Sequence, residues 1–142
     1  MFKDIYNSLY RMERQREIIE ELTIDEFKSM RANLNNEVII IKFGAEWCKP
    51  CNKIKPRVTE LFGTMPSNVI IVDIDIDDTM DLYMAFRNKK MLTGVPTLLA
   101  FHGDVKHEPG HWYISDRNVS GSDMNSVEEF FKHCSAKATS LA

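Results

Sequence analysis

The sequence has few cysteines, little net charge and no long apolar run. Three cysteines in 142 residues are too few, and odd in number, for a framework of disulfides, so each thiol needs its own explanation. The 18 basic and 21 acidic side chains give a net charge of −3, which offers no overall attraction to nucleic acid. No window approaches the ~20 apolar residues of a membrane span, and the first residues lack the apolar core of a signal peptide. These absences predict a cytoplasmic or nuclear protein that binds neither nucleic acid nor membrane, and of the two locations we expect the cytoplasm.

What is present fits one self-sufficient domain. With 44% hydrophobic and 27% charged residues, the chain can bury a core without metal or disulfide support. We therefore expect a monomer. Apolar periodicity predicts strands and helices in alternation, which is an α/β fold with a mixed central sheet flanked by helices. The predicted strands are 18–22, 38–43, 68–75 and 96–101, and the predicted helices are 24–33, the segment after Cys51, 80–88 and the segment after Ser126.

The domain organisation follows from the same periodicity. Residues 1–16 are predicted to form an amphipathic helical extension that packs on the main body. Residues 17–137 form the domain, with an enlarged hairpin insertion at about 102–120, and residues 138–142 are expected to fray. Two helix starts carry a capping-box pattern, Thr23 with Glu26 and Ser126 with Glu129.

The most informative stretch is Trp47-Cys48-Lys49-Pro50-Cys51, which lies between a predicted strand and a predicted helix. Unpaired N–H groups and the helix dipole stabilise an anion at a helix N-terminus, so the first thiol can ionise near neutral pH. Cys48 is then the nucleophile of thiol–disulfide exchange, and Cys51, one turn later, resolves the mixed disulfide. A zinc site is the alternative, but the sequence has no second pair of ligands at the required spacing.

With these residues the sequence resembles the thioredoxin family over about residues 17–136. The Trp-Cys-x-Pro-Cys motif, Pro56 five residues beyond it, and Gly94-Val95-Pro96-Thr97 all match patterns of that family. The resemblance implies a thioredoxin fold in which Val95 and Pro96 form a cis-proline loop beside the dithiol. Trp47, Lys49 and Pro50 would then be supporting residues of the active site.

The resemblance also implies a protein-disulfide reductase with no bound cofactor. Its redox-active Cys48–Cys51 disulfide would be reduced with electrons from NADPH through a thioredoxin reductase, and its partners would be disulfide-containing proteins. The alternative is a non-catalytic adaptor that keeps the fold and the cysteines and recognises partners through the N-terminal helix and the 102–120 insertion.

The sequence departs from the family pattern at two positions. Lys42 stands where thioredoxins usually have a buried aspartate, and Asp73 aligns with the usual lysine on the neighbouring strand. We hypothesise an ion pair between Lys42 and Asp73 below the active site, with Asp73 or Glu46 taking part in proton transfer to Cys51. A solvated Lys42 is the alternative. At the second position, Lys49 replaces a glycine, and its charge should favour the Cys48 thiolate and make the disulfide somewhat more oxidising.

The remaining cysteine and histidines give weaker signals. Cys134 shares a helical stripe with apolar residues and is predicted to be a core side chain, with an exposed regulatory thiol as the alternative. Three histidines, His102, His107 and His111, lie in or beside the insertion. We interpret the insertion as a partner-facing loop and not as a metal site, because one loop without cysteines offers poor ligand geometry.

Overall fold

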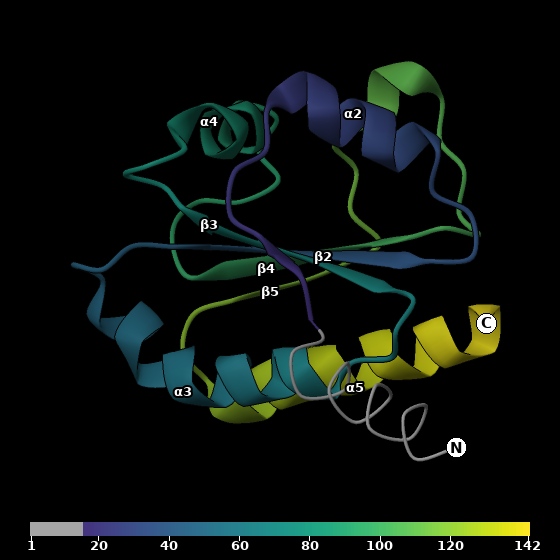
Figure 1. Ribbon diagram of the computed structural model, residues 1–142. Coiled ribbons are helices and arrows are strands. Elements are labelled where there is room, and N and C mark those ends of the chain that lie inside the picture. Colours follow the sequence, from purple (N-terminus) through teal and green to yellow (C-terminus); the bar gives the residue numbers. More distant parts are fainter. Residues whose placement is uncertain (1–15) are drawn as a thin grey trace, which may run out of the picture.

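A computed structural model describes residues 16–142 as a sheet between two layers of helices (Figure 1). Helices α2 and α4 cover one face of the sheet, and α3 and α5 cover the other. The helices are α2 (Ile24–Ala32), α3 (Lys49–Thr64), α4 (Met80–Asn88) and α5 (Met124–Leu141); the strands are β1 (Ile18–Ile19), β2 (Val38–Gly44), β3 (Val69–Asp75), β4 (Thr97–His102) and β5 (Arg117–Ser120). The extension predicted over residues 1–16 falls almost wholly outside the described residues.

The sheet of this region is mixed, as predicted. Its strand order is β1-β3-β2-β4-β5, with β2 parallel to β3 and antiparallel to β4. Every residue of the central strand β2 is buried. The nearly continuous run of β-branched residues explains this position, because such a run suits a strand that is covered on both faces.

Alternate residues of β2 join two separate cores. Ile39, Ile41 and Phe43 belong to the cluster on the α2 and α4 side, and Val38 and Ile40 belong to the cluster with α3 and α5. Full burial of one such side chain contributes about 1.5–3 kcal/mol. The strand that leads to the cysteine motif is therefore held firmly from both sides.

The two predicted capping boxes have different outcomes. At α2 the Thr23 hydroxyl accepts the Glu26 N–H at 3.0 Å and the Glu26 carboxylate accepts the Thr23 N–H at 2.9 Å, which confirms the first. At α5 the predicted box is wrong. The N-cap is Asp123, whose carboxylate accepts the N–H of Ser126 at 3.2 Å and its hydroxyl at 2.6 Å. Ser126 thus lies inside the first turn, because an acceptor three residues earlier caps the helix.

Two predicted boundaries also change. The connection between β4 and β5 is 103–116, shorter than the expected 102–120, because both of its predicted ends are strand residues; it contains a short 3-10 helix, Pro109–His111. The tail 138–142 was expected to fray, but α5 continues to Leu141. Ala138 is fully buried and its carbonyl accepts a hydrogen bond from the Asn68 side chain at 2.7 Å, which holds the last turns of α5.

Within residues 16–142 no helix has both the length and the apolar character needed to cross a membrane.

Candidate active site

The cysteine motif lies where β2 ends and α3 begins. β2 ends at Gly44, Cys48 is the N-cap of α3, and its sulfur accepts the Cys51 N–H at 3.2 Å. Pro50 lies in the first turn, where the absence of an N–H costs nothing. Sulfur therefore takes the place of the usual N-cap oxygen, and the exposed end of the helix dipole points at it.

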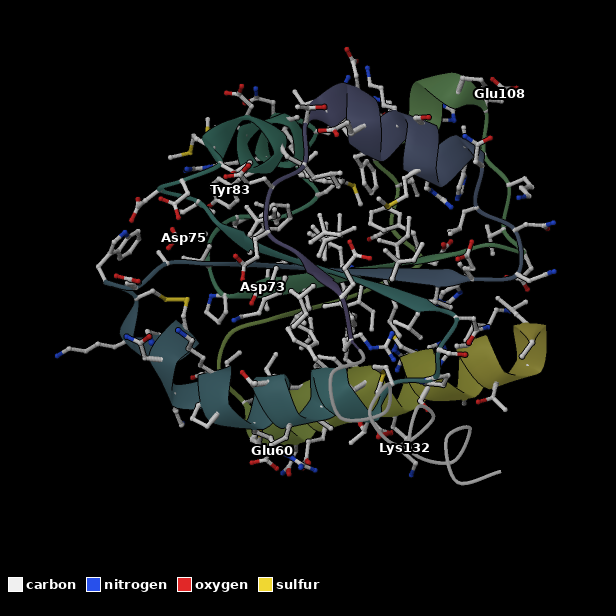
Figure 2. The ribbon with its side chains drawn as sticks, viewed as in Figure 1. Glu60, Asp73, Asp75, Tyr83, Glu108 and Lys132 are labelled. Atoms are coloured by element: carbon white, nitrogen blue, oxygen red, sulfur yellow. A yellow bond between two sulfur atoms is a disulfide. The ribbon has the colours of Figure 1, made fainter. Side chains whose placement is uncertain are left out.

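Cys48 and Cys51 form a disulfide, with their Cα atoms 5.2 Å apart. Figure 2 shows it as a yellow bond at the start of α3. Sequence reasoning expects Cys48 to be the accessible thiol. In this oxidised form the two residues are 5% and 4% exposed, so exposure does not separate their roles. The assignment of nucleophile and resolving thiol stays a prediction.

The loop before β4 lies against the disulfide. The Val95–Pro96 peptide bond is cis, and the Val95 carbonyl oxygen lies 3.7 Å from Cys48 Sγ. Two hydrogen bonds hold the loop, from the Thr97 hydroxyl to the Gly94 carbonyl at 2.7 Å and from the Gly121 N–H to the Pro96 carbonyl at 3.0 Å. The structure thus places Val95 and Pro96 beside the disulfide.

Trp47 is the most exposed large apolar side chain among residues 16–142, at 65%. Its indole N–H donates to the Asp77 carboxylate at 2.9 Å. Met80 and Met84 of α4 are the other exposed large apolar residues of this region. Asp77 is not among the site residues predicted from the sequence, because no spacing along the chain connects it with Trp47. One sequence signal could have identified Asp77. It lies two residues after the end of β3, and parallel strands β2 and β3 end at the same edge of the sheet, where Trp47 also lies.

Lys49 and Pro50 are both exposed. Below the motif, Lys42 and Asp73 occupy paired positions on β2 and β3, and their side chains form an ion pair with Nζ 3.6 Å from Oδ1. The Lys42 side chain is 8% exposed and that of Asp73 is 33% exposed. The pair is therefore present as predicted, and the alternative of a solvated Lys42 is wrong.

A cavity of about 250 Å³ connects this pair to Cys51, since Lys42, Asp73 and Cys51 all line it. A methyl group added at Gly44 would lie 3.7 Å from both Lys42 Cε and Cys51 Sγ. Lys42 and Cys51 thus flank the same small space. Figure 2 shows Asp73 and Asp75 on β3, toward the end of the sheet where the disulfide lies.

Cys134 is fully buried on α5, as predicted. Burial raises the pKa of its thiol to about 12. The thiolate is the reactive form of cysteine, so this residue is inert at neutral pH.

The three histidines of the insertion do not converge. His102 is buried and its ring centroid lies 5.8 Å from that of His133, whereas His107 faces Asp116 at 3.7 Å and His111 is exposed. Burial lowers the pKa of His102. No group of three or more His, Cys, Asp or Glu side chains in residues 16–142 is arranged to hold a metal ion.

These features together define a class of α/β protein that carries a cysteine pair at a helix N-terminus and a cis-proline loop against it. Comparison with known sequences narrows the class. The thioredoxin family model matches residues 18–111. The chain belongs to the thioredoxin family.

Individual relatives differ in length from this chain. Thioredoxin 3 of Plasmodium falciparum is 32% identical over 108 residues, which are 75% of this chain and 54% of that protein. The thioredoxin of Ophiophagus hannah is 30% identical over 119 residues, 81% of this chain and 94% of that protein. A crystal structure of Plasmodium falciparum thioredoxin superposes with a TM-score of 0.59 at 28% identity, covering 82% of this chain and 85% of that one. The chain thus spans about half of the first relative and nearly all of the second.

Proposed function

We propose that this protein reduces disulfides in other proteins through Cys48 and Cys51. The observation that carries the proposal is a disulfide at the N-terminus of α3 with the Val95 carbonyl 3.7 Å from Cys48 Sγ. A helix N-terminus favours the thiolate that exchange needs, and a backbone carbonyl beside the sulfur offers a hydrogen-bond acceptor to a bound chain. Membership of the thioredoxin family supports the same chemistry.

The exchange proceeds in two steps. The Cys48 thiolate attacks one sulfur of the substrate disulfide, a Cys48–substrate bond forms, and the other substrate sulfur leaves as a thiolate. Cys51 then loses its proton and attacks Cys48 Sγ, so the Cys48–Cys51 bond forms and the second substrate thiolate leaves. Two electrons pass from the dithiol to the substrate. The two substrate thiolates take up two protons, one from Cys51 and one from solvent that replaces the proton lost when the Cys48 thiolate formed.

The oxidised protein must be reduced again from outside, because the dithiol supplies only one pair of electrons. We propose that NADPH supplies the electrons through a thioredoxin reductase, with no cofactor bound to this chain. Trp47, exposed beside the motif, and Lys49 would contact the substrate or the reductase. A second candidate is that Asp73 or Glu46 takes part in proton transfer to Cys51, and the Asp73→Asn variant distinguishes it from proton loss to solvent.

Reduction of insulin, followed by its turbidity, tests this activity with dithiothreitol or with NADPH and thioredoxin reductase as the electron source. Cys51→Ser should abolish turnover and leave Cys48 joined to its substrate, since nothing resolves the mixed disulfide. Mass spectrometry of the adducts should find them on Cys48. Cys134→Ser is the matched control and should turn over like wild type, because that thiol is buried.

The adaptor function is the opposing outcome of this experiment. If wild type does not turn over with either electron source and Cys51→Ser forms no adduct through Cys48, the cysteine pair does not exchange with substrates. The protein would then act through binding alone.

We further propose that the protein works as a monomer in the cytoplasm. Cys134, the cysteine outside the motif, is buried and so is not available to link two chains. Analytical ultracentrifugation at micromolar concentration and cell fractionation test the two parts. A dimer, or recovery in an organelle fraction, would contradict them.

A further inference from the structure

The buried lysine below the active site has a consequence for the resolving thiol. Lys42 lies on the central strand between two neighbours. Asp73 is its partner on β3, while β4, on the other side of β2, continues from the Val95–Pro96 loop that contacts the disulfide. The strand order therefore places Lys42 between Asp73 on one side and the strand that follows the Val95–Pro96 loop on the other.

The Lys42 side chain also approaches Cys51 itself. Gly44 follows Lys42 by two residues, so both face α3, and Gly44 leaves a space that Lys42 Cε and Cys51 Sγ share. No side chain at Gly44 separates the two. A positive charge on this side of the sheet favours the thiolate of a nearby cysteine and disfavours its thiol.

Other charges line the same cavity and must be weighed against this one. They come from the segment after β1, the turn before α3, α3 itself, β3 and the turn after it: Glu20, Glu46, Lys55, Asp75 and Asp78. All of them are exposed except Asp75, which is partly exposed. Water and salt screen exposed charges, whereas a side chain that is only 8% exposed keeps much of its field. Lys42 is the most deeply buried charge in the cavity, and its partner Asp73 is 33% exposed, so water screens the positive charge less than the negative one.

We propose that Lys42 is a positioning residue that stabilises the thiolate of Cys51 in the reduced protein and thereby makes the Cys48–Cys51 disulfide more oxidising. The inference rests on the proposed exchange function and refines it. In the resolving step the Cys51 proton passes to solvent or to the departing substrate thiolate, and Lys42 acts on this step through its field alone. Stabilising the reduced form raises the reduction potential.

The decisive double variant exchanges the two charged residues, so that the charge nearest Cys51 becomes negative while an ion pair between β2 and β3 is retained. In Lys42→Asp combined with Asp73→Lys, the carboxylate stands on β2, next to Gly44, and the ammonium stands on β3. We expect the pKa of Cys51 to rise by about one unit or more. At a pH above the Cys51 pKa of both proteins, the equilibrium constant with glutathione should change about tenfold toward the protein disulfide, which is about 30 mV for a two-electron couple. Lys53→Met, an exposed lysine on α3, is the control and should change neither quantity.

Two single variants separate the charge effect from a role of Asp73 as a base. Lys42→Met should raise the pKa of Cys51, and Asp73→Asn should lower it, because Asp73→Asn leaves the ammonium without its counter-charge. If Asp73 accepts the proton instead, Asp73→Asn slows the resolving step and does not make Cys51 more acidic. That result would overturn the proposal.

The pKa is measured from the Cβ chemical shift of Cys51 in a Cys48→Ser background, and the potential from glutathione equilibria of the protein with both cysteines. Thermal unfolding shows whether each variant folds. An unchanged pKa and potential in the folded charge-reversal variant would overturn the inference. The failure of the proposed function is distinct, because it appears as an absence of insulin reduction by wild type, whereas the Cys51 titration needs no turnover.

Discussion

Lys49 stands between the two cysteines and is exposed, so its charge acts on Cys48 through solvent. Lys49→Gln should raise the pKa of Cys48 in the reduced protein by less than about one unit, the range that exposed charge pairs support. The pH dependence of Cys48 alkylation by iodoacetamide measures this shift. In 1 M salt the difference between wild type and variant should nearly disappear, because the Debye length falls to about 3 Å.

Lys53→Gln is the matched control for that measurement, since Lys53 is also an exposed lysine in the first turns of α3. It should leave the alkylation profile unchanged. A shift of Cys48 that persists in high salt would mean that Lys49 acts through a direct contact and not through its field in water.

Single residues were predictable where the chemistry depends on spacing along the chain. Cys48 and Cys51 are three apart at a strand-to-helix junction. The pair of Lys42 and Asp73 was predicted instead from the resemblance to the thioredoxin family, and the register of β2 and β3 confirms it. Asp77 was not predictable in the same way. Its hydrogen bond to Trp47 joins residues 30 positions apart, and it depends on where two loops meet.

At the scale of elements, the start of α5 gives a pH-dependent prediction. Hydrogen bonds from Ser126 lower the pKa of Asp123 in the folded protein. The stability that Asp123 contributes is therefore present above its unfolded pKa of about 3.9 and is lost as the pH falls through the folded value. Asp123→Ala should lower the free energy of unfolding at pH 7, and the difference from wild type should shrink in acid.

Asp123→Asn distinguishes the cap from the charge. Asparagine caps a helix about as well as aspartate but does not titrate in this range. Urea unfolding of the three proteins at pH 7 and near pH 2 measures the effect. Equal stability of wild type and Asp123→Ala at pH 7 would show that the cap contributes nothing.

The elements themselves were predictable to different degrees. β2 was clear because a run of β-branched residues this continuous suits only a covered strand. β5 was hidden because it is four residues long, Arg117–Ser120, and alternates between half-buried and exposed, so its pattern resembles that of the polar loop before it. The α5 cap was misplaced because Ser126 and Glu129 imitate a capping box inside a helix that had already begun at Met124.

At the scale of the molecule, the three thiols fall into two groups, a disulfide and a buried cysteine. After reduction, two thiols per chain should react quickly with a chromogenic thiol reagent under native conditions, and the third should react only in denaturant. The pKa of Cys134, about 12, keeps it protonated as well as covered. Three fast thiols in the native protein would contradict this division.

Cys48 is both the proposed nucleophile and the N-cap of α3, a helix of 16 residues. The redox state of its sulfur is therefore coupled to the stability of the first turn of that helix. When the bridge opens, the cap acceptor changes from a neutral disulfide sulfur to a thiolate, and hydrogen bonds to charged acceptors are stronger. Amide hydrogen exchange at Cys51 should therefore slow in the reduced protein if opening the bridge leaves the first turn in place. This coupling is reciprocal. A partner that binds and stabilises the first turn of α3 therefore also shifts the equilibrium between the Cys48–Cys51 disulfide and the dithiol, without contacting either sulfur.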